Sequence, residues 1–353
     1  MKKYYLLIVM SFAALGVMAQ TSLVATLTHA GVTTEYYGEK AFVTAVEASA
    51  DGDLITLSEG LFTGPTINKS LNIRGNGVGS TVITSNVTLD KSADEDEANH
   101  WLNIEGITFN SDIRIKGPVS REPYVVKDLC MKKCDIKNFG FESYYYNGDY
   151  YYSTLKNCSF INCRITNDIQ MRNVCEVSFI NSIVKGYNYQ ASKYGEQETN
   201  PKVNMLNCVI ITNTAPDGVT YLNAKNSVLL ISVNNYRAYS FSSTVSFQNC
   251  VISGYIDSPD AVKSFFLNGI PHDKTIWMPM EEVFATLTEY RLYDATNDYQ
   301  LNEITSEEVD GNLLGIYNGE VPYTSTVTYP HFTTFNVAEK AVDGKLSVEV
   351  ATE

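Results

Sequence analysis

The residues best suited to catalysis are two lysines, Lys132 and Lys156, which hold the same position in two copies of a repeated pattern. If the copies stack, the two amines lie one coil apart on one face, and a neighbouring positive charge lowers the pKa of a lysine. Such a lysine can act as a general base and abstract a proton from a uronic-acid unit, which is the chemistry of a polysaccharide lyase. The alternative is that both are solvated surface lysines.

Carboxylates, the other common catalytic groups, are sparse where the repeat projects side chains outward. Calcium-dependent lyases need several Asp or Glu ligands, and polysaccharide hydrolases need two carboxylates about 5 to 10 Å apart. Beside the anchors of the repeat, Asp135 is the one acidic residue at an outward position. The sequence also has no CxxC pair and no histidine cluster, so it predicts neither a metal site nor a cofactor.

Tyrosine offers binding chemistry. The chain has 24 tyrosines, and six of them lie between positions 144 and 152. Flat aromatic faces stack on sugar rings, and the hydroxyl adds a hydrogen bond at small entropic cost. The predicted contact surface for a glycan or protein consists of Tyr144, Tyr145, Tyr146, Tyr194, Tyr221 and Tyr239. The alternative is that the tyrosines cover loops and pack on the outer sheet.

The charge balance restricts the partners. The net charge is −14, and loss of Lys2 and Lys3 with a leader peptide makes it −16. Nucleic-acid binding depends on neutralising phosphates with Lys and Arg, so we expect no nucleic-acid partner. An acidic surface of this kind keeps an exported protein soluble.

One eight-residue template recurs between positions 129 and 252: apolar, any, apolar, any, usually Asn, then Cys or Ser, any, apolar. Its copies read LCMKKCDI (129–136), STLKNCSF (153–160), VSFINSIV (177–184), VNMLNCVI (203–210), LNAKNSVL (222–229) and VSFQNCVI (245–252). The Cys or Ser anchors follow one another every 19 to 26 residues. Alternation with period two on both sides of a small turn residue predicts a strand, a corner and a second strand.

A unit of about 23 residues cannot bury its own apolar face, so the coils must stack and pair through parallel strands. Propeller blades are longer, and helical repeats need helical periodicity. The pattern therefore predicts an all-β fold, a right-handed parallel β-helix or solenoid. Its test is that Phe160, Val184, Ile210 and Ile252 share one interior column.

Asparagine precedes most anchors. It tolerates the backbone conformation of a corner, and its amide can bond to the amide one coil away. The predicted structural ladder consists of Asn157, Asn181, Asn207, Asn226 and Asn249. The anchor cysteines alternate with serine, which predicts small, buried, unbridged thiols. These are Cys134, Cys158, Cys208 and Cys250.

The two ends of the predicted solenoid carry a family resemblance. The segment 39–77 combines a helical pattern at Phe42, Val43 and Val46 with a turn and first strands, and resembles the N-terminal cap of the pectin-lyase-like superfamily. The segment 297–324 resembles the closing coil of secreted bacterial members. The matching residues are Asp298, Tyr299, Leu301, Asp310, Gly311, Gly315, Tyr317 and Gly319. The resemblance implies a right-handed β-helix and polysaccharides as the substrate class, with enzymes and non-enzymes in the same group.

The first residues resemble an export signal. Lys2 and Lys3 precede an apolar stretch, and Val17-Met18-Ala19 has the small residues that signal peptidase requires. We expect a signal peptide at 1–19, an N-terminal cap at 20–50, the β-helix at 51–324 and a C-terminal β-strand tail at 325–353. The protein is expected to be secreted, periplasmic or on the cell surface, and not integral to a membrane.

Three functions remain open at this point. The favoured one is a non-catalytic β-helix scaffold that binds a polysaccharide or a cell-surface component. The second is a polysaccharide lyase that acts on uronic-acid polymers through loop residues or the two lysines. The third is a structural spacer or adhesin module. Fold analogy alone supports the polysaccharide class.

Overall fold

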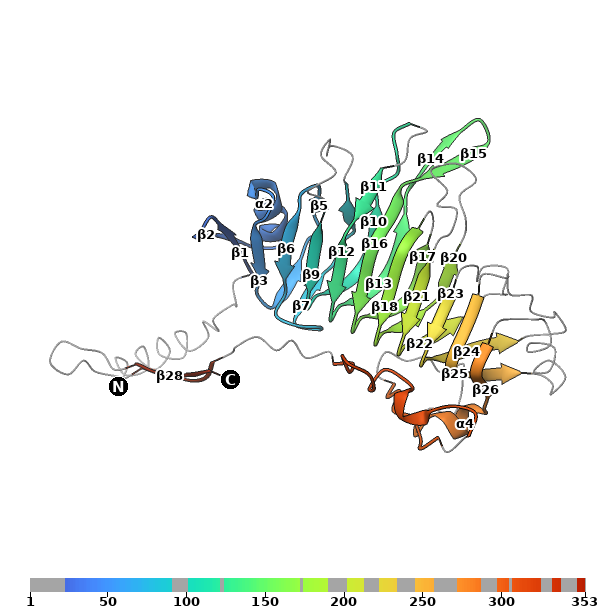
Figure 1. Ribbon diagram of the computed structural model, residues 1–353. Helices are drawn as coiled ribbons and strands as arrows, with labels where there is room; N and C mark the ends of the chain where they lie inside the picture. The colour runs from blue at the N-terminus through green and yellow to red at the C-terminus, as the bar shows by residue number, and fades with distance from the viewer. Residues whose placement is uncertain are drawn as a thin grey trace, which may run out of the picture.

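A long, mostly parallel sheet forms the body of the protein, as the repeat predicts (Figure 1). The computed structural model describes residues 23–90, 101–120, 124–171, 174–189, 202–212, 222–233, 245–256, 272–286, 297–304, 307–324, 332–337 and 348–352. Within these ranges the main sheet has 24 strands, and successive coils pair in parallel so that the chain forms a solenoid-like stack. The expected all-β class is confirmed.

The strands fall into three stacks that run along the molecule. The first stack lies before the anchors and contains β3 (Leu54–Leu57), β6 (Leu71–Arg74), β9 (Leu102–Glu105), β11 (Val125–Lys127), β12 (Leu129–Lys132), β16 (Thr154–Ile161), β18 (Val174–Ile180), β21 (Val203–Leu206), β23 (Leu222–Lys225) and the start of β25 (Val245–Ile256).

The second stack follows the anchors. It contains β4 (Gly60–Phe62), β7 (Thr81–Ile83), the starts of β10 (Thr108–Ile115), β13 (Asp135–Phe141) and β17 (Arg164–Met171), then β19 (Ile183–Lys185), β22 (Val209–Thr212), β24 (Val228–Val233) and the end of β25. β26 (His272–Trp277) closes both stacks. The third stack contains β5 (Thr66–Ile67), β8 (Val87–Leu89), the ends of β10, β13 and β17, and β20 (Tyr187–Tyr189).

Inward side chains of successive coils line up in columns, and these columns are the hydrophobic core. Strand pairing joins the second-stack column Phe109, Ile136, Ile165, Val184, Ile210, Leu229 and Ile252. The first-stack column is Ile73, Ile104, Met131, Phe160, Phe179, Met205, Ala224 and Phe247. Stacking the coils therefore buries the apolar faces that a single coil would leave exposed.

The predicted column was wrong at one member. Val184, Ile210 and Ile252 share the second-stack column, but Phe160 belongs to the first stack, where its ring stacks on Phe179 at 4.8 Å. The residue that completes the column is Ile165. The copy at 153–160 had been aligned to Asn157-Cys158, whereas the equivalent corner is Asn162-Cys163 five residues later.

Two kinds of corner explain this error, because both need a residue with positive φ. Asn157 (φ 52°) belongs with Asp128 (φ 51°) and Glu176 (φ 56°), at a corner within the first stack that separates β11 from β12. Its side-chain amide donates to the carboxylate of Asp128. Asn157 is therefore not a member of the anchor ladder. Asn and Asp adopt the left-handed conformation more readily than most residues, and they suit either corner.

The anchors are buried and unbridged. Cys134, Cys163, Cys208 and Cys250 alternate with Ser182 and Ser227 in one position, and the four cysteines are free thiols. Each anchor donates to a carbonyl one coil earlier; Ser182 Oγ bonds Phe160 O at 3.2 Å and Cys208 Sγ bonds Phe179 O at 3.4 Å. Cys158 is also free and buried, but packs in the first stack beside Val177. The predicted free thiols are confirmed.

The anchor asparagines hold the C-terminal part of the chain. Asn249 Nδ2 donates to Asn226 Oδ1 at 3.0 Å, which is the bond expected of a ladder. The other contacts differ: Asn181 donates to Ile316 O and Asn318 O (2.8 and 2.6 Å), Asn207 to Leu313 O (2.6 Å), and Asn162 to Val321 O (3.2 Å). We call residues 307–324 the C-terminal strap. Most of the anchor asparagines thus bind the strap and not each other. We call Asn162, Asn181, Asn207, Asn226 and Asn249 the docking track.

The strap and the chain before it cover the outer side of the second stack near β25 (Figure 1). The short helices α4 (Met280–Val283) and η3 (Gly311–Leu313) belong to this layer. Its side chains form a second apolar cluster on the outward residues of the last coils. Examples are Phe284, Leu314 and Ile316 against Ile183, Val209 and Val251. Met280 and Val283 of α4 are buried in this cluster.

The N-terminal end carries an antiparallel hairpin, β1 (Val24–His29) and β2 (Val32–Tyr37), and the helix α2 (Ala41–Ala48). The helix predicted from this segment is confirmed, with Phe42 and Val46 buried. Near the other end, β27 (Phe332–Val337) and β28 (Val348–Thr352) lie in the expected β-strand tail and pair antiparallel. The proposed signal peptide lies outside the described residues. Among those residues, no helix has the length and apolar character needed to cross a membrane.

Candidate functional site

The outer side of the third stack has a cleft of about 320 Å³ between β10, β13 and β17. We call it the polar cleft. Strand pairing places two rows of side chains across it: Asp112, Asn138 and Asp168 in one row, and Arg114, Gly140 and Gln170 in the next. Glu142 and Ser143 also line it. The cleft thus presents carboxylates, amides and a guanidinium on three neighbouring coils.

Hydrogen bonds fix the first row. Asn167 Nδ2 donates to Asn138 Oδ1 at 2.7 Å, and Asn138 Nδ2 donates to Asp112 Oδ1 at 2.8 Å. Arg114 Nη2 donates to the other oxygen of Asp112 at 2.7 Å. A chain of bonded groups with one direction orders the side chains before any ligand arrives.

The same bonds set the charge of Asp112. The hydrogen bond from Arg114, followed by the bond from Asn138, lowers the pKa of Asp112 below its ordinary value. The carboxylate is therefore ionised at neutral pH and is matched by the Arg114 charge. Two coils further along, Gln170 Nε2 donates to Asp168 Oδ2 at 2.9 Å and orients that carboxylate.

A hairpin of tyrosines continues from the cleft. β14 (Ser143–Tyr146) and β15 (Asp149–Tyr152) pair antiparallel, and Ser143 is also a lining residue of the cleft. Asn147 (φ 52°) and Gly148 (φ 90°) make the two-residue turn that favours this hairpin. Figure 1 shows the hairpin extending beyond the end of the stacked strands. Its rings are consequently presented to solvent close to the polar cleft.

The tyrosine rings form two faces. The Tyr144 and Tyr146 rings are nearly parallel with centroids 6.3 Å apart, and the Tyr145 and Tyr150 rings contact each other at 4.9 Å. Tyr145 is 60% exposed and Tyr150 is 54% exposed, whereas Tyr151 is buried. Tyr144, Tyr145 and Tyr146 are thus brought together as predicted. Tyr194, Tyr221 and Tyr239 lie outside the described residues.

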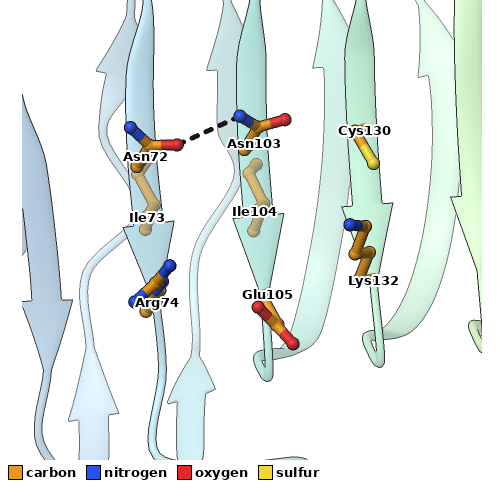
Figure 2. Close-up of a pocket in the computed structure, with 8 residues that line it drawn as sticks. All are labelled: Asn72, Ile73, Arg74, Asn103, Ile104, Glu105, Cys130 and Lys132. Atoms are coloured by element: carbon orange, nitrogen blue, oxygen red, sulfur yellow. Dashed lines mark hydrogen bonds between the residues drawn. The ribbon is translucent and has the colours of Figure 1, made fainter. Parts of the chain in front are cut away.

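A second, smaller pocket of about 150 Å³ lies on the outer side of the first stack (Figure 2). We call it the charged pocket. Arg74, Glu105 and Lys132 follow one another on β6, β9 and β12, with Asn72 and Asn103 beside them. Asn103 Nδ2 donates to Asn72 Oδ1 at 3.0 Å. The two cations and one anion give this pocket a net charge of +1.

The predicted pairing of the two lysines was wrong. Lys132 lies between Glu105 and Ile161 in the strand register, whereas Lys156 pairs with Lys127. The misaligned copy at 153–160 caused the error, since it shifted Lys156 by one corner. Lys132 and Lys156 therefore do not stack on each other, and the lysine beside Lys156 is Lys127.

The polar cleft was missed because it lies outside the eight-residue template. Each of its strands nevertheless carries a polar residue directly before an inward apolar one, as in Asp112-Ile113, Asn138-Phe139 and Asp168-Ile169. Alignment of these dipeptides would have found the row. Among the described residues, no group of three or more His, Cys, Asp or Glu side chains could hold a metal ion.

Comparisons with protein-family models, curated proteins and solved structures found no match to this chain.

Proposed function

We propose that this chain is an exported, right-handed parallel β-helix of the pectin-lyase-like type that binds a glycan without cleaving it. The binding surface is the polar cleft together with the tyrosine hairpin. The partner is a polysaccharide, free or at a cell surface.

The stacked columns and the three strand stacks support the β-helix. Parallel strands need a crossover connection, and such connections are right-handed in nearly all known sheets. The helix α2 lies at the N-terminal end, where the resemblance implies a cap. The Asp298–Gly319 motif covers the last coils from the outside, whereas the resemblance implies a closing coil.

One observation carries the binding proposal: the cleft with its ordered polar groups is joined through Ser143 to a hairpin that carries exposed aromatic rings. Carboxylates, amides and Arg114 can bond to sugar hydroxyls, and the exposed Tyr145 and Tyr150 rings can stack on a sugar face. Binding sites commonly combine a few fixed polar groups with aromatic surface. The shared residue Ser143 makes the two parts continuous.

The lowered pKa of Asp112 favours binding over hydrolysis. Asp112 and Asp168 are two strands apart in the register, about 9.5 Å, a separation that an inverting hydrolase could use. The general acid of such an enzyme needs a raised pKa, but the pKa of Asp112 is lowered by Arg114. In the lyase alternative, the predicted Lys132–Lys156 pair is replaced by Lys127 and Lys156, which are register neighbours.

The test is a glycan array probed with the wild-type protein and with Tyr145→Ala/Tyr150→Ala. We expect signals on a subset of polysaccharides and a loss of about tenfold or more with the double variant, because each sugar–aromatic contact is removed. Asn103→Ala, in the charged pocket, is the matched control and keeps the signal. Unchanged signals in the tyrosine variant would contradict the proposal.

A parallel assay separates binding from cleavage. Bound polymers are incubated with the protein, and the absorbance of unsaturated products and the number of new reducing ends are followed. We expect no increase in either. A rise in unsaturated products would favour the lyase, and a rise in reducing ends alone would favour a hydrolase.

A further inference from the structure

Gly140 is a glycine that neither the backbone nor the packing requires. It lies in strand β13, its φ is not in the left-handed region, and an added Cβ would meet only Gln170 Oε1 at 4.0 Å. Glycine inside a strand costs stability relative to other residues. It often marks a place where another group approaches the backbone closely. Both register neighbours of Gly140 carry long side chains, Arg114 and Gln170.

The missing side chain therefore leaves a hollow in the floor of the polar cleft, between the guanidinium and the amide. Its borders are charged unequally. Arg114 forms an ion pair with Asp112, with an N–O distance of 2.7 Å. The nearby Lys116 forms one with Asp90, with an N–O distance of 2.6 Å. Within the described ranges, Asp168 and Glu142 form no ion pair, although Lys116 acts electrostatically on Glu142 and Lys137 acts on Asp112. Lys116 and Asp90 cancel, and the three carboxylates Asp112, Glu142 and Asp168 outnumber the two cations Arg114 and Lys137, which leaves the hollow with a negative excess.

We infer that the polar cleft seats an amine-bearing sugar unit over the backbone of Gly140, with its ammonium group between Asp168 and Glu142. This inference rests on the proposed function and names its ligand class. A uronic-acid unit would bring its carboxylate to the same two carboxylates and is disfavoured. Over longer distances, the net charge of −14 also attracts a cationic oligosaccharide and repels an anionic one.

The test compares three oligosaccharides of equal length by calorimetry: a glucosamine hexamer, its N-acetylated counterpart and a galacturonic-acid hexamer. We expect the glucosamine hexamer to bind tightest and the galacturonic-acid hexamer weakest. Asp168→Asn should weaken binding of the glucosamine hexamer about tenfold or more and leave the N-acetylated hexamer unchanged. Glu105→Gln removes the same charge from the charged pocket and should change neither.

Gly140 is tested by Gly140→Ala and Gly140→Val. We expect a graded loss of affinity for the glucosamine hexamer together with a melting temperature that stays equal or rises, since a strand favours both replacements. A purely structural glycine would show the opposite, a lower melting temperature with affinity retained.

Different failures have different meanings. Equal or tighter binding of the galacturonic-acid or N-acetylated hexamer, or an unaffected Asp168→Asn variant, overturns the amine-bearing ligand while glycan binding stands. Absence of binding to every oligosaccharide and to the array overturns the proposed function as well.

Discussion

At the scale of single residues, the anchor position shows how small groups are used in a solenoid core. Thiol and hydroxyl alternate there because both are small and both donate to the carbonyl one coil earlier. Burial raises the pKa of Cys208 to about 12 and that of Cys250 to about 11, from an ordinary value of 9.0. These thiols are consequently inert packing groups rather than nucleophiles.

The raised thiol pKa values predict a loss of stability in alkali. Below pH 9 the thiols are protonated in both states, and their contribution to stability is complete. Above pH 9 the unfolded chain releases protons that the folded chain retains, so stability falls by up to about 1.4 kcal/mol per pH unit for each thiol. Urea unfolding at pH 8, 9 and 10 measures this slope.

The matched variant is Cys208→Ser/Cys250→Ser, because serine already holds this position at Ser182 and Ser227. We expect it to fold and to show a shallower alkaline slope than the wild type. A slope that remains identical would mean that these thiols do not control alkaline stability.

At the scale of elements, the sequence was sufficient for the strand–corner–strand unit but not for its register everywhere. Five of the six copies align correctly on apolar alternation alone. At 153–165 two corners occur five residues apart, and both read Asn-Cys, so periodicity fits either one. Only pairing with neighbouring coils decides between them, and that information is not local. The same limit hid the polar cleft, whose rows join residues of different coils.

The corrected register makes a sharp prediction for two isoleucines of neighbouring elements. Ile165 is fully buried in the second-stack column, and Ile161 is on the outer side of the first stack. Ile165→Ala should lower the free energy of unfolding by about 2–5 kcal/mol, and Ile161→Ala by less than about 1 kcal/mol. Chemical denaturation of the two variants checks the difference. Equal losses would contradict the register.

The docking track predicts the effect of cutting one strap contact. Asn207→Ala removes the donor to Leu313 O and Gly315 O and should cost about 1–3 kcal/mol of stability. We expect hydrogen exchange to rise mainly in residues 307–324. Asn223→Ala is the control, because Asn223 is an exposed residue of β23 whose side chain bonds to Asn204 and Ser246, and it should leave exchange in residues 307–324 unchanged. Faster exchange throughout the solenoid would argue against a local docking role.

At the scale of the whole molecule, the outward surface of the second stack changes character along its length. Early coils present Thr108, Asp135 and Arg164, whereas later coils present Ile183, Val209 and Val228. The change occurs where the outer layer begins to cover the sheet. The later coils thus place a run of apolar residues outward where the C-terminal part of the chain shields them, although Leu61 and Val82 precede Thr108 in the same row and Leu61 is 57% exposed.

This coverage predicts the result of truncation. A chain ending at residue 278 would expose the apolar outer cluster over several coils. We expect it to bind hydrophobic dyes and to associate, because large exposed apolar patches promote aggregation. Dye fluorescence and light scattering measure this, with a chain ending at residue 324 as the control. A truncated chain that stays monomeric and dye-negative would contradict the shielding role.

In a stack where each coil touches only its neighbours, either end can fray one coil at a time. The strap changes this, because its backbone is bonded in turn to the coils of Asn249, Asn207, Asn181 and Asn162. Opening any one of these coils must also break hydrogen bonds to the strap, which the other coils bind as well. We therefore expect the coils bonded to the strap to unfold cooperatively. The early coils are not bonded to it in the described residues, and they can unfold separately.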